Sequence, residues 1–202
     1  YLPEDPTHDI IAFDTGPGNA ILNELVEIIT AGQHNFDRDA LLSSQGKCDA
    51  RLLSDLLKHP YFQLNPPKST GREEFGAEYI KQLLLEHPDE SIAPHNLLRT
   101  LVSLITHSIA DAYQKYFPSP DRIYLSGGGA HHPLILKELK KLLGEQKVAI
   151  FQPENGISAD AKEAVAFAVL AHERINHTPT NLPSVTGAKK YTTLGKISIP
   201  YL

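Results

Sequence analysis

Apolar residues recur every three to four positions along most of the chain, which is the spacing of one face of an α-helix. The segments that share this spacing are about 19–31, 49–58, 94–116, 133–143 and 159–174. Pro94 suits the first turn of the longest one, and Gly32 and Gly144 stand where two others end. Asp160 and Glu163 have the spacing of a capping box at the start of the last one. The pattern predicts a chain in which helices predominate.

Residues 60–86 combine loop and helix signals. The proline pair 66–67 excludes a helix there, so residues 60–71 are expected to form a long loop. Thr70 and Glu73 again have capping-box spacing, which predicts a helix that runs to about residue 86.

Short apolar runs bounded by turn residues predict strands. Three such runs are clear, at 10–14, 123–125 and 147–151, and an apolar alternation at 194–199 could form an edge strand. Beyond residue 177 the sequence is otherwise irregular. Together with the helices, these runs predict an α/β fold with few strands and several helices.

Composition narrows the class of protein. The chain has 202 residues, 41% hydrophobic and 21% charged, which suits one large soluble domain or two small subdomains. A net charge of -5 without a basic run argues against a nucleic-acid partner, and no apolar stretch is long enough to span a membrane. Cys48 is the single cysteine, so the reducing cytoplasm is the expected location. The chain starts at Tyr1 without an initiator methionine, so we expect a processed chain or a fragment.

Two glycine-rich turns, about 110 residues apart, follow the first two predicted strands. They are Asp14-Thr15-Gly16-Pro17-Gly18-Asn19 and Ser126-Gly127-Gly128-Gly129-Ala130. Glycine lets backbone N–H groups approach a ligand closely, and the start of a helix carries partial positive charge that favours an anion. The pair predicts a nucleotide held between two segments of one lobe.

Asp14 ends the first predicted strand and faces the first turn. Ligands of α/β folds bind at the carboxyl ends of strands, where a carboxylate takes a proton from a hydroxyl or water or holds magnesium through water. The alternative is that Asp14 only accepts hydrogen bonds from the turn amides of Gly16 and Gly18. The spacing favours neither.

Other candidate residues are less specific. Segment 68–73 offers cations and hydroxyls at a helix start but lacks the order of a P-loop, so a capped helix and a ligand contact both stay open. The histidines show no zinc-ligand spacing, and the neighbours His131 and His132 point in different directions on a helix. Glu163 lies in the first turn of its helix, where stabilising the helix end is its default role.

Six motifs stand in order along nearly the whole chain. They are Phe13 to Asn19, Pro60 to Phe62, Pro66 to Glu73, Gly127 to His131, Glu163 to Ala168 and Asn181 to Ala188. In this order they resemble the C-terminal half of the anhydro-N-acetylmuramic acid kinase family. The resemblance implies one lobe of an actin-like, ribonuclease-H-like ATPase fold. Residues 1–202 would be that C-terminal lobe, with a mainly helical insertion at about 32–120 and an irregular tail at about 178–202.

The resemblance also implies an activity, that of a carbohydrate kinase using ATP and magnesium. Such enzymes open the 1,6-anhydro ring of anhydro-N-acetylmuramic acid by hydrolysis and phosphorylate O6, which gives N-acetylmuramic acid 6-phosphate. Asp14 would be the catalytic residue, taking a proton from the water that attacks the anomeric carbon. The residues that would bind ATP are Gly16, Gly18, Asn19, Lys68, Gly127, Gly128, Gly129 and Ala130. Glu163 would bind the sugar.

Some features depart from the family pattern. The family's N-terminal lobe carries a Gly-Thr-Ser phosphate turn and much of the sugar pocket, so we expect that lobe as a partner and the isolated chain to be inactive. His132 stands where the family commonly has asparagine, and Asn23 where it has aspartate. Levoglucosan kinases share the Asp14 motif, so that activity remains an alternative, as does a non-catalytic nucleotide-binding module. We also expect a homodimer, because exposed apolar surface promotes association.

Overall fold

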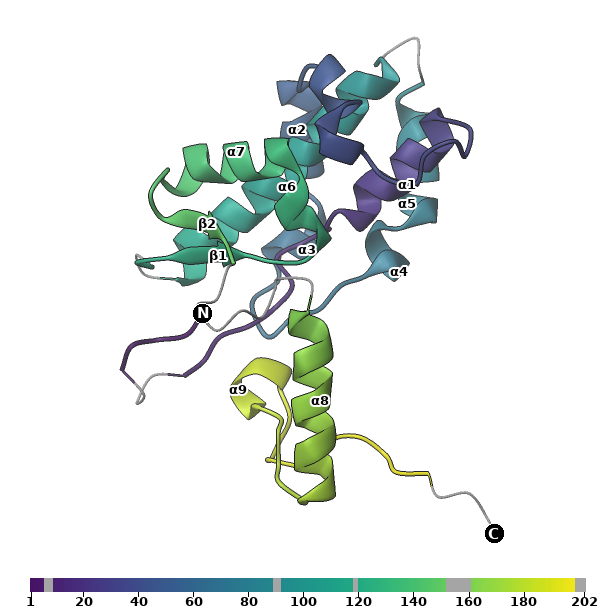
Figure 1. The fold of residues 1–202 in the computed structure, drawn as a ribbon. Coiled ribbons are helices and arrows are strands. Elements are labelled where there is room, and N and C mark those ends of the chain that lie inside the picture. The colour runs from purple at the N-terminus through teal and green to yellow at the C-terminus, as the bar shows by residue number, and fades with distance from the viewer. Residues whose placement is uncertain (6–8, 89–91, 118–119, 152–160, 199–202) are drawn as a thin grey trace. The chain divides into compact units, whose positions relative to one another are not determined.

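The computed structural model describes residues 1–5, 9–88, 92–117, 120–151 and 161–198. The chain divides into two compact units, one of Asp14–Phe151 and the other of Tyr1–Phe13 with Gln152–Leu202. Figure 1 labels the helices and strands.

The larger unit holds most of the secondary structure. Its elements are α1 (Ala20–Ile29), the 3-10 helices η1 (Arg38–Ala40) and η2 (Ser43–Gln45), α2 (Ala50–Leu56), α3 (Pro60–Gln63), α4 (Arg72–Phe75), α5 (Ala77–Glu86), α6 (Pro94–Tyr116), β1 (Ile123–Leu125), η3 (Gly128–His131), α7 (Pro133–Leu143) and β2 (Val148–Ile150). The smaller unit holds α8 (Lys162–Ile175) and α9 (Pro183–Thr186). The described structure is therefore a mostly helical α/β fold, as the sequence predicted. None of the described helices has the length and apolar character needed to cross a membrane.

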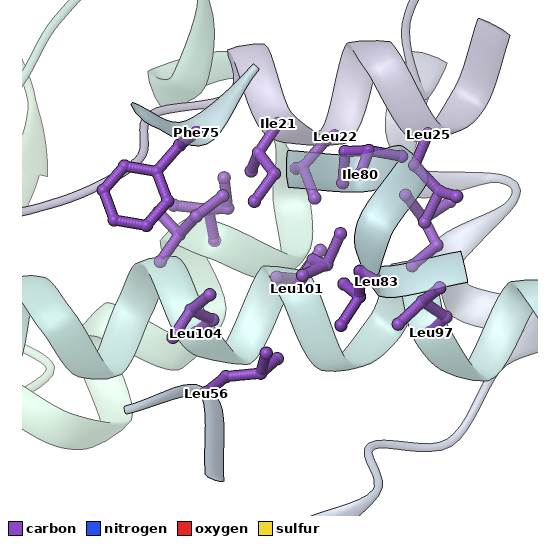
Figure 2. Close-up of a cluster of buried hydrophobic side chains, with 14 of the residues drawn as sticks. Ile21, Leu22, Leu25, Leu56, Phe75, Ile80, Leu83, Leu97, Leu101 and Leu104 are labelled. Carbon is purple, nitrogen blue, oxygen red and sulfur yellow. The ribbon is translucent and has the colours of Figure 1, made fainter. Parts of the chain in front are cut away.

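Helix α6 is the centre of the larger unit. It contacts α1, α2, η2 and α7, and 12 of its 23 residues are buried. Figure 2 shows apolar side chains of α1 and α5 directed at those of α6, among them Leu22, Ile80 and Leu101. Leu101 and Ile80 are fully buried, and burying a side chain of this size stabilises a fold by roughly 1.5–3 kcal/mol. The core forms where the apolar faces of these helices meet.

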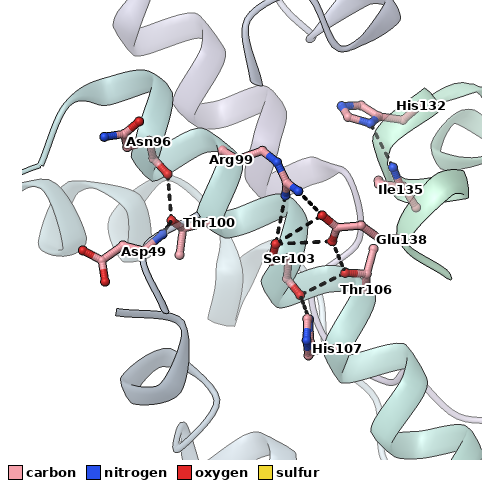
Figure 3. A network of polar contacts seen from close by, with 10 residues as sticks. All are labelled: Asp49, Asn96, Arg99, Thr100, Ser103, Thr106, His107, His132, Ile135 and Glu138. Atoms are coloured by element: carbon pink, nitrogen blue, oxygen red, sulfur yellow. Dashed lines mark hydrogen bonds and ion pairs between the residues drawn. The ribbon is translucent and has the colours of Figure 1, made fainter. Parts of the chain in front are cut away.

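A polar network joins α6 to α7 beside this core (Figure 3). The Arg99 guanidinium forms an ion pair with Glu138 and donates to Ser103 Oγ at 2.9 Å. Thr106 Oγ1 donates to the other oxygen of Glu138 at 2.7 Å. Because both charged side chains are mostly buried, each depends on these partners for the hydrogen bonds that water would otherwise provide.

The sheet is small and parallel. Ile123 pairs with Val148 and Leu125 with Ile150, and α7 provides the connection between the strands. Parallel strands need such a crossover, which explains why the Gly127 turn, α7 and the second strand follow one another. These two strands and α7 lie where the sequence predicted them.

The strand predicted at 10–14 is wrong. Residues 10–14 form no strand, and only partly buried or exposed side chains occur there. A strand exists only when a neighbour completes its ladder, and within the described residues the backbone of Ile11 exchanges hydrogen bonds only with Tyr1. The expected edge strand is also absent at residues 194–198, while Ile199 lies outside the described residues.

Three local predictions between 60 and 86 need correction. The expected loop begins with the short helix α3, whose start is capped by His59. Thr70 is not a cap, because Gly71 precedes the first turn and Thr70 Oγ1 donates to Glu74 instead. The helix is interrupted at Gly76, where a side chain would collide with the carbonyl of Arg72.

The capping box predicted at the start of α8 is not described in full. Ala161 occupies the N-cap position and makes no side-chain capping bond, while Asp160 lies outside the described residues.

The α6–α7 network generates a stability prediction. Glu138→Ala should lower the free energy of unfolding of the full-length protein by about 3 kcal/mol, because it leaves the Arg99 charge buried without a partner. Urea denaturation followed by circular dichroism measures the loss. Replacing both charges with apolar residues, Arg99→Met with Glu138→Leu, should recover most of it.

The matched control is Asp55→Ala, which removes one member of the exposed Lys58–Asp55 pair. Exposed pairs contribute little, so this variant should unfold almost as the parent does. Equal unfolding curves for Glu138→Ala and Asp55→Ala would contradict a stabilising role of the network.

Candidate active site

Asp14 is exposed, and one edge of its carboxylate is held by the loop at 68–70. Oδ2 accepts a hydrogen bond from Ser69 Oγ at 2.9 Å and one from the Thr70 N–H at 3.0 Å. Within the described residues, Oδ1 accepts none. The hydrogen bonds do not come from Gly16 or Gly18, so the turn-capping alternative is wrong. A carboxylate held at one oxygen and open at the other is arranged to accept a proton.

The backbone of Asp14 is held as firmly as its side chain. Its N–H donates to the Lys68 carbonyl at 3.2 Å, and its carbonyl accepts from Tyr61 Oη at 2.6 Å. Burial, followed by the charges of Asp14 and Glu74, raises the pKa of Tyr61 to about 12. The phenol therefore keeps its proton and remains a donor to Asp14 across the neutral range.

The Lys68 ammonium lies against the face of the Tyr61 ring. It is 4.6 Å from the Tyr61 ring centroid and donates to the Tyr61 carbonyl at 3.2 Å. Burial, and to a lesser degree the charge of Lys115, lowers the pKa of Lys68. Lys68 lines a pocket of about 200 Å³ together with Thr15, Ser108 and Lys115.

The two glycines of the first turn have different surroundings. A Cβ on Gly16 would lie 2.6 Å from Phe62 and 3.1 Å from Ser108 Oγ, so only glycine lets this turn pack against α3 and α6. A Cβ on Gly18 would meet nothing within 4 Å. Gly16 therefore allows the turn to pack against α3 and α6, and the backbone at Gly18 remains accessible.

Asn19 brings the two glycine turns together. A Cβ on Gly128 would lie 3.3 Å from Asn19 Nδ2, and one on Gly129 4.0 Å from Asn19 Oδ1. Asn19 precedes α1 but makes no side-chain capping bond there, so its amide faces the second turn. Gly127 has a φ of +77°, a conformation that glycine adopts without strain. The turns predicted to act together are in contact, with exposed backbone at Gly18, Gly127 and Gly128.

A pocket of about 120 Å³ opens beside this contact. Asn19 and Gly128 form part of its wall, and Asp37, Arg38 and His132 form another part. Asp37 is buried, and its carboxylate accepts from the N–H groups of Leu42 at 2.8 Å and Ser43 at 3.0 Å. A longer contact of 3.4 Å joins Asp37 Oδ2 to His132 Nε2.

The sequence analysis singled out neither Asp37 nor the adjacent pocket residues Arg38 and Asp39. The signal that could have found them is the charged run Asp37-Arg38-Asp39, which lies between two predicted helices. Burial opposes ionisation of Asp37, but hydrogen bonds from His132, Ser43 and Leu42 outweigh it and lower its pKa to about 2. Asp37 is therefore ionised at neutral pH although it is buried.

The structure brings Lys68 beside the first glycine turn, since the Lys68 carbonyl accepts from the Asp14 N–H. Lys68 and Gly128 line different pockets. Glu163 is exposed in the first turn of α8, which belongs to the other compact unit. The described residues include no group of three histidine, cysteine or acidic side chains placed to hold a metal ion.

A model of the anhydro-N-acetylmuramic acid kinase family matches residues 4–200. The chain belongs to this family. It is similar to the anhydro-N-acetylmuramic acid kinase of Caldanaerobacter subterraneus subsp. tengcongensis, with 43% identity over 95% of this chain and 49% of the relative. It also resembles the proteins of that name from Salinibacter ruber, at 40% identity over 95% of the chain and 48% of the relative, and from Bacillus cereus strain Q1, at 38% over 95% and 50%. The chain spans about half the length of these curated relatives of the anhydro-N-acetylmuramic acid kinase family.

The first turn generates a prediction with its own control. Gly16→Ala should lower the free energy of unfolding by about 1–3 kcal/mol, because the added methyl group meets Phe62 and Ser108. Gly18→Ala should leave stability unchanged or slightly raised, since its methyl group has room. Thermal and urea unfolding of both variants in the full-length protein measure this. A Gly16→Ala protein as stable as Gly18→Ala would contradict the described packing of the turn.

Asp37 generates a prediction about pH. Its folded pKa lies below the ordinary value of 3.8, so its contribution to stability is complete above about pH 4 and is lost as the pH falls toward 2. The shift corresponds to about 2 kcal/mol. Asp37→Asn should therefore destabilise the protein by about that amount at pH 7 and by progressively less from pH 4 downward, as measured by urea unfolding at several pH values.

The control for this variant is Asp39→Asn. Asp39 is exposed, and its positive φ of 53° is tolerated by asparagine. If the loss of unfolding free energy in Asp37→Asn stayed constant between pH 7 and pH 3, the charge of Asp37 would not be its cause.

Proposed function

We propose that the protein is an ATP-dependent anhydrosugar kinase that acts on 1,6-anhydro-N-acetylmuramic acid. The observation that carries the proposal is the Asp14 carboxylate, which is held at Oδ2 and open at Oδ1 next to two glycine turns in mutual contact. Membership in the family, and the name of the relatives, support the choice of substrate.

The chemistry requires a base before it requires a phosphoryl group. In a 1,6-anhydro sugar O6 belongs to an internal acetal, so no hydroxyl is present to be phosphorylated until the ring opens. In our proposal Asp14 Oδ1 takes a proton from water while the water oxygen bonds to C1 and the C1–O6 bond breaks. The freed O6 then accepts the phosphoryl group that ATP supplies, giving N-acetylmuramic acid 6-phosphate and ADP. Ser69 and Thr70 keep the carboxylate oriented through Oδ2.

The described backbone fits a nucleotide phosphate in two respects. The amides at the start of α1 have no side-chain cap, and helix starts favour anions. We assign the phosphates to Gly16, Gly18, Asn19 and Lys68, and the adenosine side to the turn from Gly127 to Ala130. Magnesium would be held mainly by the phosphates and water, as is usual for this ion, since the described residues offer no carboxylate cluster for it. Glu163 would contact the sugar.

The proposal extends to the rest of the protein. We infer that this chain is the C-terminal lobe of an actin-like kinase, that the other half of the family chain supplies the opposing lobe, and that the enzyme works in the cytoplasm as a homodimer. The support for a second lobe is that the chain spans about half the length of its relatives. Because phosphoryl transfer depends on charge neutralisation and positioning, the 202 residues alone should bind nucleotide weakly and show no turnover.

The direct test is to incubate the full-length protein with ATP, magnesium and either 1,6-anhydro-N-acetylmuramic acid or levoglucosan, and to follow ADP release. We expect turnover with the muramic acid derivative. Asp14→Asn should lower kcat by about 10²- to 10⁴-fold, the usual contribution of a general base, and leave ATP binding intact. Asp55→Asn, which changes an exposed carboxylate of α2, is the matched control and should keep parental kcat.

Each other outcome is informative. Turnover with levoglucosan alone would identify the protein as a levoglucosan kinase. Nucleotide binding without turnover on either sugar would favour a non-catalytic module, and a normal kcat for Asp14→Asn would remove Asp14 from the role of base.

A further inference from the structure

We propose that Arg38 is a phosphate-binding residue of the nucleotide site, held at the edge of the pocket between the two glycine turns. The inference rests on the proposed nucleotide-dependent function and adds a residue to it. None of the six motifs that resemble the kinase family includes Arg38.

Arg38 is an exposed cation without a carboxylate partner in the part of the chain that the structure describes. Its guanidinium lies 5.5 Å from the centroid of the Phe36 ring, a contact that leaves the N–H groups of the fork available. An arginine fork matches the oxygens of a phosphate and binds them with two parallel hydrogen bonds. Arg38 therefore has both the charge and the free donors that such a contact needs.

The position of Arg38 is fixed by its buried neighbour. The Asp37 carboxylate accepts hydrogen bonds from the N–H groups of Leu42 and Ser43, which closes the loop that follows Arg38. The same carboxylate contacts His132 Nε2, and His132 directly follows η3, which contains Gly128 and Gly129 of the second glycine turn. Since His132 Nδ1 accepts from the Ile135 N–H, we assign the ring proton to Nε2. Asp37 thus ties the segment carrying Arg38 to the turn at Gly128, across 95 residues of sequence.

The pocket itself selects the size of the bound group. Arg38, Asn19 and Gly128 all line it, so the cation, an amide and exposed glycine backbone share one space. Its volume of about 120 Å³ is below the roughly 300–1,000 Å³ of pockets that enclose a drug-sized ligand. It therefore suits one group of a larger ligand, and the Arg38 cation in its wall suits an anionic group.

Arg38 is the guanidinium of a pocket whose lining also includes the carboxylates of Asp37 and Asp39. Asp37 accepts from Leu42, Ser43 and His132. The exposed Asp39 also lines the pocket, and among the described residues its carboxylate has no hydrogen-bond donor. Arg38 offsets that charge, in a chain whose net charge is -5. Removing the cation would leave an acidic pocket that repels phosphate.

The test compares ATP with adenosine, which has the same base and sugar but no phosphate. Isothermal titration calorimetry on the full-length protein measures the affinity of each for the parent, Arg38→Ala, Arg38→Lys and Arg51→Ala. Arg51 is an exposed arginine of α2 that does not line the pocket, so Arg51→Ala is the matched control. We expect Arg38→Ala to weaken ATP binding by about 10- to 100-fold, the range for a lost hydrogen bond to a charged group, with adenosine binding unchanged. Arg38→Lys should retain part of the parental ATP affinity, and Arg51→Ala should retain all of it.

Three results would overturn the inference. An equal loss for ATP and adenosine would mean that Arg38 acts on the nucleoside or on the fold, and parental ATP affinity in Arg38→Ala would mean that Arg38 touches no phosphate. A parent protein that binds neither ligand would overturn the nucleotide site as a whole. By contrast, the predicted pattern in a protein without sugar turnover would support Arg38 as a phosphate contact and refute only the kinase activity.

Discussion

Close packing against α6 is the constraint on which the larger unit depends. The helix contacts α1, α2 and α7 and shares an apolar core with them and with α5, and it also pairs Arg99 with Glu138 of α7. One helix thus positions the elements that bear the candidate site. The first glycine turn shows the consequence most directly. A Cβ on Gly16 would lie 3.1 Å from Ser108 Oγ of α6 and 2.6 Å from Phe62 of α3, so the turn after Asp14 packs against these helices only because residue 16 has no side chain. Interiors of this density transmit small changes in volume to their surroundings, which connects the core to the site.

The polar network between α6 and α7 extends this control to the second glycine turn. Glu138 lies on α7, whose first turn is capped by His132, and His132 directly follows η3, which contains Gly128 and Gly129. A displacement of α7 along α6 would break the pairing of Glu138 with Arg99 and Thr106 while moving the turn away from Asn19. Because buried charges are costly to leave unpaired, the network favours one position of α7.

The site combines firm support with accessible chemistry. Tyr61 and Ser69 contact Asp14 from two different elements, and neither bond uses Oδ1. Supporting groups of this kind reduce the freedom of a catalytic side chain before the substrate arrives, which is how an enzyme obtains a productive orientation at low entropic cost. Asp37 has the corresponding role for the loop that carries Arg38. Both carboxylates are held by hydrogen bonds, but Asp37 is buried and Asp14 is exposed, so one serves structure and the other can serve chemistry.

The sequence by itself determined the features that depend on neighbours along the chain. The periodic apolar residues of α1, α6 and α7 and the short run at Ile123–Leu125 define their elements locally, and the motifs identified the family. The strand predicted at 10–14 failed because an apolar run specifies a strand only if a partner strand is present. Tertiary structure alone decided which hydroxyl donates to Asp14, a contact between residues 55 apart. It also decided which loop contacts the segment after the second glycine turn, through Asp37 and His132. No local pattern encodes such contacts, because they exist only after α6 has gathered the elements that carry them.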